Sequence, residues 1–241
     1  MHTSNKILVA LVAFLFLVPA FMLAAFRLKI AGGRFTLEQY SPMAKPRLTT
    51  LKPASILVLR GNDQTELYSA IGYGDSASCE LLHHNTADSL VLKQSGDTLF
   101  VELQSKGGGI GAEKTNMYLQ LRMPSIRTVI ASGAQVTVDS LPVSEPVDFR
   151  LLDKSGLELG RPEEDSLPAY FGPYFIIASN SRVSLLGTTV MPSLKLQLSG
   201  KSELNIAPAA SIGKIEGSAG SSVLVSGPSR YLYRLQEKSG L

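Results

Sequence analysis

The second half of the chain repeats one pattern: a short alternating run of apolar residues, a bend of small residues, and a second short run. In residues 193–206, SLKLQLSGKSELNI, the side chains of Leu194, Leu196 and Leu198 alternate with polar ones, as in a strand that buries one face. Gly200 lies at the bend and permits the positive φ that other residues resist. Related units occupy residues 127–138, 147–159, 174–186, 194–206, 213–225 and 232–241.

The first apolar residue after each bend defines the period of the repeat. These residues are Val136, Leu157, Val183, Leu204, Val223 and Leu241, and the intervals between them are 21, 26, 21, 19 and 18 residues. One unit of this size cannot bury its Leu and Val side chains alone, whereas stacked units bury them in a continuous column. The pattern therefore predicts an all-β solenoid over residues 55–241, with Ser, Gly and Asn stacked at the bends. An antiparallel sandwich of similar strands is the alternative.

The N-terminal region contains one long apolar segment. Residues 7–26, ILVALVAFLFLVPAFMLAAF, carry no charge and as a helix would span about 30 Å, the thickness of the bilayer's hydrocarbon core. We expect a retained transmembrane anchor in contact with membrane lipid, after a tail of residues 1–6. A cleaved secretory signal is the main alternative, although its apolar core is usually shorter; a buried core helix is the third. Long domains translocate largely regardless of flanking charge, so the body is expected in the periplasm or at the cell exterior.

Charge and composition exclude some functions for the rest of the chain. Of the 23 Lys and Arg residues, four precede Phe35, which leaves 19 against 20 Asp and Glu residues in the remainder. A nearly neutral body argues against a nucleic-acid partner, which requires a concentrated basic face. Cys79 is the only cysteine, so an internal disulfide is ruled out. Residues 27–54, in which residues 35–53 are rich in proline and read as irregular, are interpreted as a spacer.

No catalytic, metal or cofactor site is expected. His83 and His84 are adjacent, so on a strand they would point to opposite faces, and two ligands fall short of a zinc site. The acidic run 163–165 lacks the spacing of a calcium loop and is interpreted as a solvated turn. The many serines have no base in a recognisable motif context.

Residues 168–175, PAYFGPYF, form the densest aromatic cluster in the chain. Aromatic faces beside acidic residues can bind sugar rings, so Tyr170, Phe171 and Tyr174 are candidate ligand-binding residues. The alternative is that these rings pack over the core. Near the C-terminus, Tyr231 and Tyr233 are expected to cap the last unit, because an exposed solenoid end invites edge pairing.

The order of several short motifs resembles the head GIN domain family, described as auto-transporter adhesin heads and common in Bacteroidota. The residues that carry the resemblance are RMPSI at 122–126, ASGA at 131–134, LSGKS at 198–202 and DTLFV at 97–101. The resemblance covers about residues 56–241. It implies a right-handed parallel β-helix facing the envelope or exterior, with no established enzyme activity and hence no catalytic residues. One departure is that residues 175–181, FIIASNS, lack the Ser-Gly bend.

Three functions remain open from the sequence. The first is a membrane-anchored, envelope-facing binding or scaffold module of the adhesin type, without catalysis, whose partner is an envelope protein or a glycan. The second is an accessory single-pass subunit of a membrane protein complex. The third is a carbohydrate-active β-helix enzyme, which would need two converging carboxylates that the sequence does not obviously supply.

Overall fold

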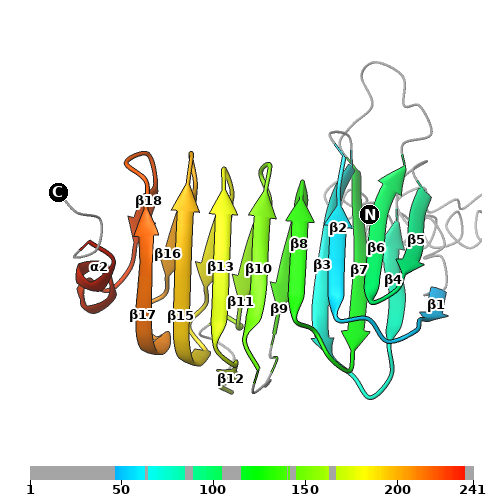
Figure 1. Ribbon diagram of the computed structural model, residues 1–241, viewed down its shortest axis with the longest axis horizontal. Coiled ribbons are helices and arrows are strands. Elements are labelled where there is room, and N and C mark those ends of the chain that lie inside the picture. Colours follow the sequence, from blue (N-terminus) through cyan, green and yellow to red (C-terminus); the bar gives the residue numbers. More distant parts are fainter. Residues whose placement is uncertain are drawn as a thin grey trace, which may run out of the picture. The chain divides into compact units, whose positions relative to one another are not determined.

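The computed structural model describes residues 47–62, 65–84, 89–104, 115–139, 141, 145–162 and 167–236, which belong to one compact unit, Ala44–Leu241. These residues confirm the all-β class: two nine-stranded sheets and one short helix, α2 (Ser229–Gln236). Figure 1 shows the strands running side by side along the unit.

Sheet A has the strand order β1-β4-β7-β3-β9-β11-β14-β16-β18. Its strands are β1 (Arg47–Thr50), β3 (Thr65–Tyr73), β4 (Ser78–His84), β7 (Thr115–Met123), β9 (Ala134–Val138), β11 (Gly156–Leu159), β14 (Arg182–Leu185), β16 (Glu203–Ile206) and β18 (Leu224–Ser226).

Sheet B has the order β12-β15-β13-β10-β8-β2-β6-β5, and β17 pairs with β15. Its strands are β2 (Ile56–Arg60), β5 (Ser89–Ser95), β6 (Thr98–Gln104), β8 (Thr128–Ser132), β10 (Val147–Leu152), β12 (Ala169–Tyr170), β13 (Tyr174–Ser179), β15 (Thr189–Ser199) and β17 (Ser211–Ala219).

The predicted hydrophobic column is present from β9 onward. Leu157 pairs in parallel register with Val136 on one side and Val183 on the other, and Val183 pairs with Leu204. All four side chains are at most 1% exposed. The fifth expected member, Val223, was wrong by two residues, because it precedes β18 and Leu204 pairs with Val225 instead. A residue two positions away lies on the same face of a strand, so the alternation alone could not separate the two valines.

Both sheets are mixed, and the finer expectation of a parallel β-helix is therefore not confirmed. Antiparallel pairs join β1 to β4, β4 to β7, and β5 to β6. The other described strand pairs are parallel, including all those after β8. The alternative of an antiparallel sandwich therefore does not describe this part of the chain. The strands β2 and β3 also insert between neighbours that follow them in the chain: β2 pairs with β6 and β8, and β3 with β7 and β9.

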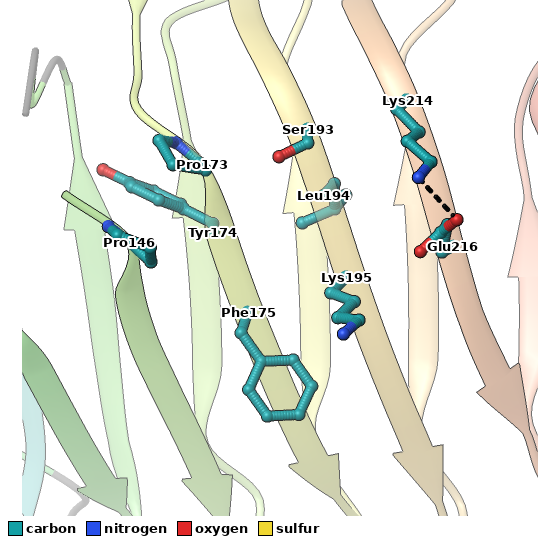
Figure 2. A pocket seen from close by; sticks show the side chains of 9 residues that line it. All are labelled: Pro146, Pro173, Tyr174, Phe175, Ser193, Leu194, Lys195, Lys214 and Glu216. Atoms are coloured by element: carbon teal, nitrogen blue, oxygen red, sulfur yellow. Dashed lines mark ion pairs between the residues drawn. The ribbon is translucent and has the colours of Figure 1, made fainter. Parts of the chain in front are cut away.

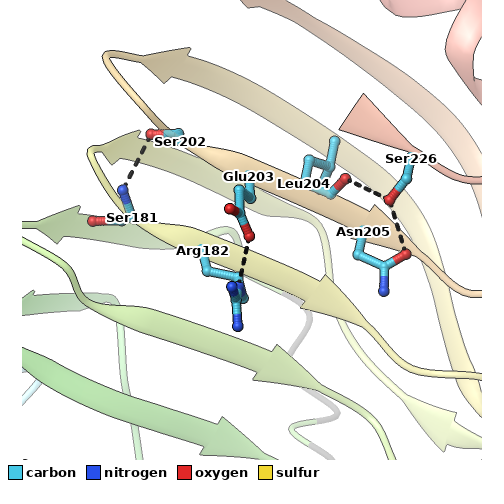
Figure 3. Close-up of polar contacts among 7 residues, drawn as sticks. All are labelled: Ser181, Arg182, Ser202, Glu203, Leu204, Asn205 and Ser226. Carbon is cyan, nitrogen blue, oxygen red and sulfur yellow. Dashed lines mark hydrogen bonds and ion pairs between the residues drawn. The ribbon is translucent and has the colours of Figure 1, made fainter. Parts of the chain in front are cut away.

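The bends stack in line, as their chemistry predicted (Figure 3). The backbone N–H of Ser181 donates to Ser202 Oγ at 3.3 Å, and Ser202 Oγ donates to the carbonyl of Ser199 at 2.6 Å. Gly133 and Gly200 have φ of 61°, and Asn180 takes the equivalent place with φ of 50°. Asn tolerates this left-handed conformation, and its Oδ1 accepts the backbone N–H of Lys201 at 3.0 Å. The missing Ser-Gly bend is thus replaced without a change of turn geometry.

Helix α2 occupies Ser229–Gln236, so the expectation of a strand unit at 232–241 was wrong over 232–236, and the rest of that unit lies outside the described residues. Tyr231 caps the stack as predicted: its ring is 5% exposed, its hydroxyl donates to the Ala210 carbonyl, and that hydroxyl accepts the Ile212 N–H, both at 3.0 Å. Tyr233 is 70% exposed and does not seal the end. Helical spacing explains the difference, because residues two apart point in different directions on a helix.

The expected spacer and anchor have different outcomes. The stretch 35–53 was expected to be irregular, but β1 lies inside it and pairs with β4 through backbone hydrogen bonds. Residues 7–26 lie outside the described residues, so the transmembrane helix stays a prediction. Within the described ranges, the one helix is too short to cross a bilayer.

Candidate functional site

A groove of about 410 Å³ lies over three neighbouring strands of sheet B, namely β13, β15 and β17, and beside Pro146, which precedes β10 (Figure 2). Nine residues line this surface, which we call the sheet B groove: Pro146, Pro173, Tyr174, Phe175, Ser193, Leu194, Lys195, Lys214 and Glu216. The lining divides into an apolar half, made by Pro146 and Pro173 before β10 and β13 and by Phe175 on β13, and a more polar half on β15 and β17.

The apolar half results from where the strands begin. Pro146 and Pro173 each precede the first residue of a strand, a position where the missing N–H of proline does not interrupt the ladder. The carbonyl of Pro173 instead accepts the Val147 N–H at 3.1 Å. Phe175 follows the buried Tyr174, and strand alternation turns its half-buried ring outward into the groove. Two proline rings and one phenyl ring thus lie next to one another on the surface.

The polar half contains two lysines and one glutamate, Lys195, Lys214 and Glu216, so its net charge is positive. Lys214 Nζ and Glu216 Oε1 form an ion pair at 2.9 Å, with both side chains partly in solvent. Lys195 pairs in register with Phe175 on one side and Glu216 on the other. Its side chain is exposed and takes part in none of the ion pairs found among the described residues. The groove therefore offers an uncompensated ammonium group beside an aromatic ring.

The aromatic residues predicted to bind ligand are mostly core residues. Phe171 and Tyr174 are 5% and 2% exposed, and their rings meet edge to face with centroids 5.7 Å apart. Tyr174 also packs on Phe149 at 5.1 Å. Tyr170 lies on β12, 56% exposed, and only Tyr174 of the three lines the groove. The structure brings Phe171 and Tyr174 together as packing partners, and a ligand role for the three stays a prediction.

The hydroxyl of Tyr174 is buried without a hydrogen-bond partner among the described atoms. Burial raises the pKa of this hydroxyl far above its ordinary value, because the phenolate would lose its hydration. The ring therefore stays neutral at ordinary pH and packs against Phe149 and Phe171.

A second aromatic pair, which the sequence analysis missed, lies on the outer face of sheet A. Tyr68 and Tyr118 pair in register on β3 and β7, and their rings stack with centroids 4.8 Å apart and an interplanar angle of 16°. Tyr68 Oη donates to Glu66 Oε2 at 2.6 Å, which raises the pKa of Tyr68 to about 12. Only the long-range pairing of β3 with β7 brings the two rings together, so no local pattern indicated them.

We expect Glu66→Gln to bring the pKa of Tyr68 back toward 10. The hydrogen bond from the Tyr68 hydroxyl to the Glu66 carboxylate is the largest cause of the raised pKa. Since the folded-state pKa is raised, the bond contributes stability below pH 10 and loses that contribution as the pH rises from 10 to about 12. Alkaline absorbance titration of the phenolates measures the shift, and Tyr68→Phe identifies the late-titrating group. Tyr174 also titrates late because it is buried, so the diagnostic signal is the phase that Tyr68→Phe removes. Persistence of that same phase in Glu66→Gln would contradict the assignment.

Metal-binding potential is low in the part of the chain that the structure covers. Across these ranges, no group of three or more His, Cys, Asp or Glu residues is placed to hold an ion. His83 and His84 lie in β4, while the acidic run 163–165 falls outside the described residues. The expected absence of metal and cofactor therefore stays a prediction.

Comparison with known proteins gives little further guidance. No family model and no curated protein matches the sequence, so the head GIN resemblance also stays a prediction.

Among solved structures, a candidate adhesin from Parabacteroides merdae is similar at 13% identity, covering 77% of this chain and 93% of its own, with a TM-score of 0.31. A candidate cell adhesion protein from Clostridium sporogenes has 11% identity, 73% and 100% coverage and a TM-score of 0.27. A candidate lipid-binding protein from Parabacteroides distasonis has 12% identity, 77% and 76% coverage and a TM-score of 0.34. Likenesses this distant support no inference about function.

Proposed function

We propose that this chain is a binding or scaffold module of the adhesin type, anchored in the membrane by residues 7–26, with its body facing the envelope or the cell exterior. In this proposal the stacked units form a right-handed parallel β-helix, and the module catalyses no reaction. The observation that carries the proposal is the sheet B groove, an open surface across three strands that combines apolar rings with a lysine outside the ion pairs of the described residues.

The chemistry of the groove favours binding over hydrolysis. A glycosidase needs two carboxylates that flank the scissile bond, one of them as an acid or base. The groove lining contains one carboxylate, Glu216, and it is already neutralised by Lys214 at 2.9 Å. An extended sheet face, by contrast, suits contact with a long partner, as in other stacked-repeat proteins.

The test is a retention screen with the full chain in a mild non-ionic detergent, immobilised and exposed to a panel of proteins, neutral polysaccharides and acidic polysaccharides. The groove variant Phe175→Ala/Lys195→Ala is compared with Leu152→Ala/Lys201→Ala, which also removes one apolar side chain and one lysine, at exposed positions outside the groove. We expect the groove variant to lose at least about tenfold in affinity for one ligand class, and the matched variant to lose less than about twofold.

Other outcomes of the screen would replace the proposal. Equal retention by both variants would remove the groove as the binding site. Shortening of a polysaccharide, abolished by Glu216→Gln, would indicate a carbohydrate-active enzyme. A reproducible heteromeric species held together by residues 7–26 would indicate an accessory membrane subunit.

A further inference from the structure

The sheet B groove has the chemistry to select one class of ligand. We propose that it is a subsite for a carboxylate-bearing sugar unit within a linear acidic polysaccharide. This inference rests on the proposed binding function and adds the ligand's chemical class to it.

The first argument concerns the backbone. The inner strands β13 and β15 pair on both sides, β13 with β10 and β15, and β15 with β13 and β17. Their N–H and C=O groups are therefore used within the sheet, and a peptide cannot add itself there as a further strand, because strand addition needs a free edge. A ligand lying over β13 and β15 is therefore recognised through side chains, which suits a ring bearing hydroxyl groups better than an extended peptide.

The second argument concerns the two halves of the lining. Pro146, Pro173 and Phe175 offer apolar ring surfaces, which pack against the C–H face of a pyranose ring as they pack against other apolar surfaces. Ser193 and the Lys214–Glu216 pair offer donors and acceptors to the hydroxyl groups at the edge of such a ring. A ligand with one apolar face and a polar rim matches this division.

The third argument concerns charge. Lys195 lies between Phe175 and Glu216 in the register, at the boundary between the two halves. Glu216 is neutralised by Lys214, so the ammonium group of Lys195 is the uncompensated charge of the groove. A carboxylate on a sugar packed against Phe175 would complete this site with a charge-assisted hydrogen bond. Adjacent strands are about 4.8 Å apart, so the ring and its substituent need to span only one strand spacing.

The experiment measures binding of the full chain, in mild non-ionic detergent with a chelator present, to four probes. These are polygalacturonate, the same polymer with its carboxyl groups methyl-esterified, dextran sulfate and poly-L-glutamate. We expect polygalacturonate to bind, and esterification to weaken binding at least about tenfold, since it removes the charge and keeps the ring. Binding should also weaken as salt rises, because the lysine is exposed.

Variants locate the site. Lys195→Glu is expected to reduce affinity for polygalacturonate at least about tenfold, and Phe175→Ala about threefold to tenfold. Lys201→Glu makes the same charge change at an exposed bend outside the groove and is expected to change affinity less than about twofold. Equal unfolding midpoints of Lys195→Glu and Lys201→Glu would exclude misfolding as the cause of a loss.

Each contrary result has a separate meaning. Equal binding of dextran sulfate or poly-L-glutamate would overturn the sugar carboxylate in favour of a general anion site or an acidic protein. Equal losses in Lys195→Glu and Lys201→Glu would overturn the groove location. Groove-dependent binding of a neutral glycan or a protein, with no binding of polygalacturonate, would overturn this inference and leave the proposed function standing. If no ligand in the wider panel depends on the groove, both fail.

Discussion

Replacing Phe149 with alanine is expected to lower the free energy of unfolding by about 3–5 kcal/mol, the usual cost of removing a phenyl ring from a packed core. The ring is 0% exposed and lies against Tyr174, with centroids 5.1 Å apart. Its strand β10 pairs with β8 and β13, so the cavity would open beneath three neighbouring strands. Urea unfolding of the full chain in mild non-ionic detergent, followed by circular dichroism, measures the loss.

The matched control is Leu152→Ala at the end of the same strand, where the side chain is 40% exposed. Surface substitutions of this kind change stability by about 0.5 kcal/mol or less. Because Tyr174 lines the groove and packs against Phe149, we also expect Phe149→Ala to weaken groove binding, whereas Leu152→Ala should not. Similar unfolding midpoints for the two variants would show that Phe149 is not a core residue.

Replacing Gly61 with alanine is expected to cost about 2–3 kcal/mol, through overpacking of backbone against backbone. Gly61 follows β2, and its N–H donates to the Ser132 carbonyl at 2.9 Å. A Cβ atom at Gly61 would overlap the carbonyl oxygen of Gly133, which is backbone and cannot rotate away. The bend after β2 would have to separate from the bend after β8, and the inserted pair β2 and β3 would lose its register with β8 and β9.

Gly72→Ala is the control, since it makes the same substitution in β3 at a position where a Cβ meets no atom within 4 Å. The φ of Gly72 is outside the left-handed region. Alanine should therefore leave the free energy of unfolding unchanged or raise it by about 0.4–1 kcal/mol, because it lowers the conformational entropy of the unfolded chain. Hydrogen exchange measured by mass spectrometry should show faster exchange in β2, β3 and β8 of Gly61→Ala only. Unchanged protection there would contradict the close approach of the two bends.

Local sequence pattern predicted much of the second half of the chain. The alternation in β10, β13 and β15 identified which side chains face inward, and the small-residue bends identified where each strand ends. These features depend on neighbours along the chain, because strand periodicity and the left-handed tolerance of glycine and asparagine are local properties. The same reasoning misassigned Val223 and the C-terminal helix, where two local readings were equally consistent with the pattern.

The candidate site could be predicted only in part. The sequence drew attention to the aromatic cluster that includes Tyr174 and Phe175, but it selected Tyr170, Phe171 and Tyr174. Of these three, Tyr170 is exposed away from the groove, and the other two are buried. Lys195, Lys214 and Glu216 carried no signal, because each is an ordinary polar residue on an alternating strand. They become a site only when β15 and β17 are placed in register beside β13.

The amino-acid sequence by itself determined the strand-rich class, the inward faces and the repeated bends of this protein. The tertiary structure decided the order of the strands: β2 and β3 lie between units that follow them in the chain, and antiparallel strands β4 and β5 flank β7 and β6. The reason is that burial of apolar area is not directional, so any order of similar strands satisfies the alternation. Which strand pairs with which depends on register and long-range hydrogen bonding across the whole sheet, and these determine where Phe175 and Lys195 meet.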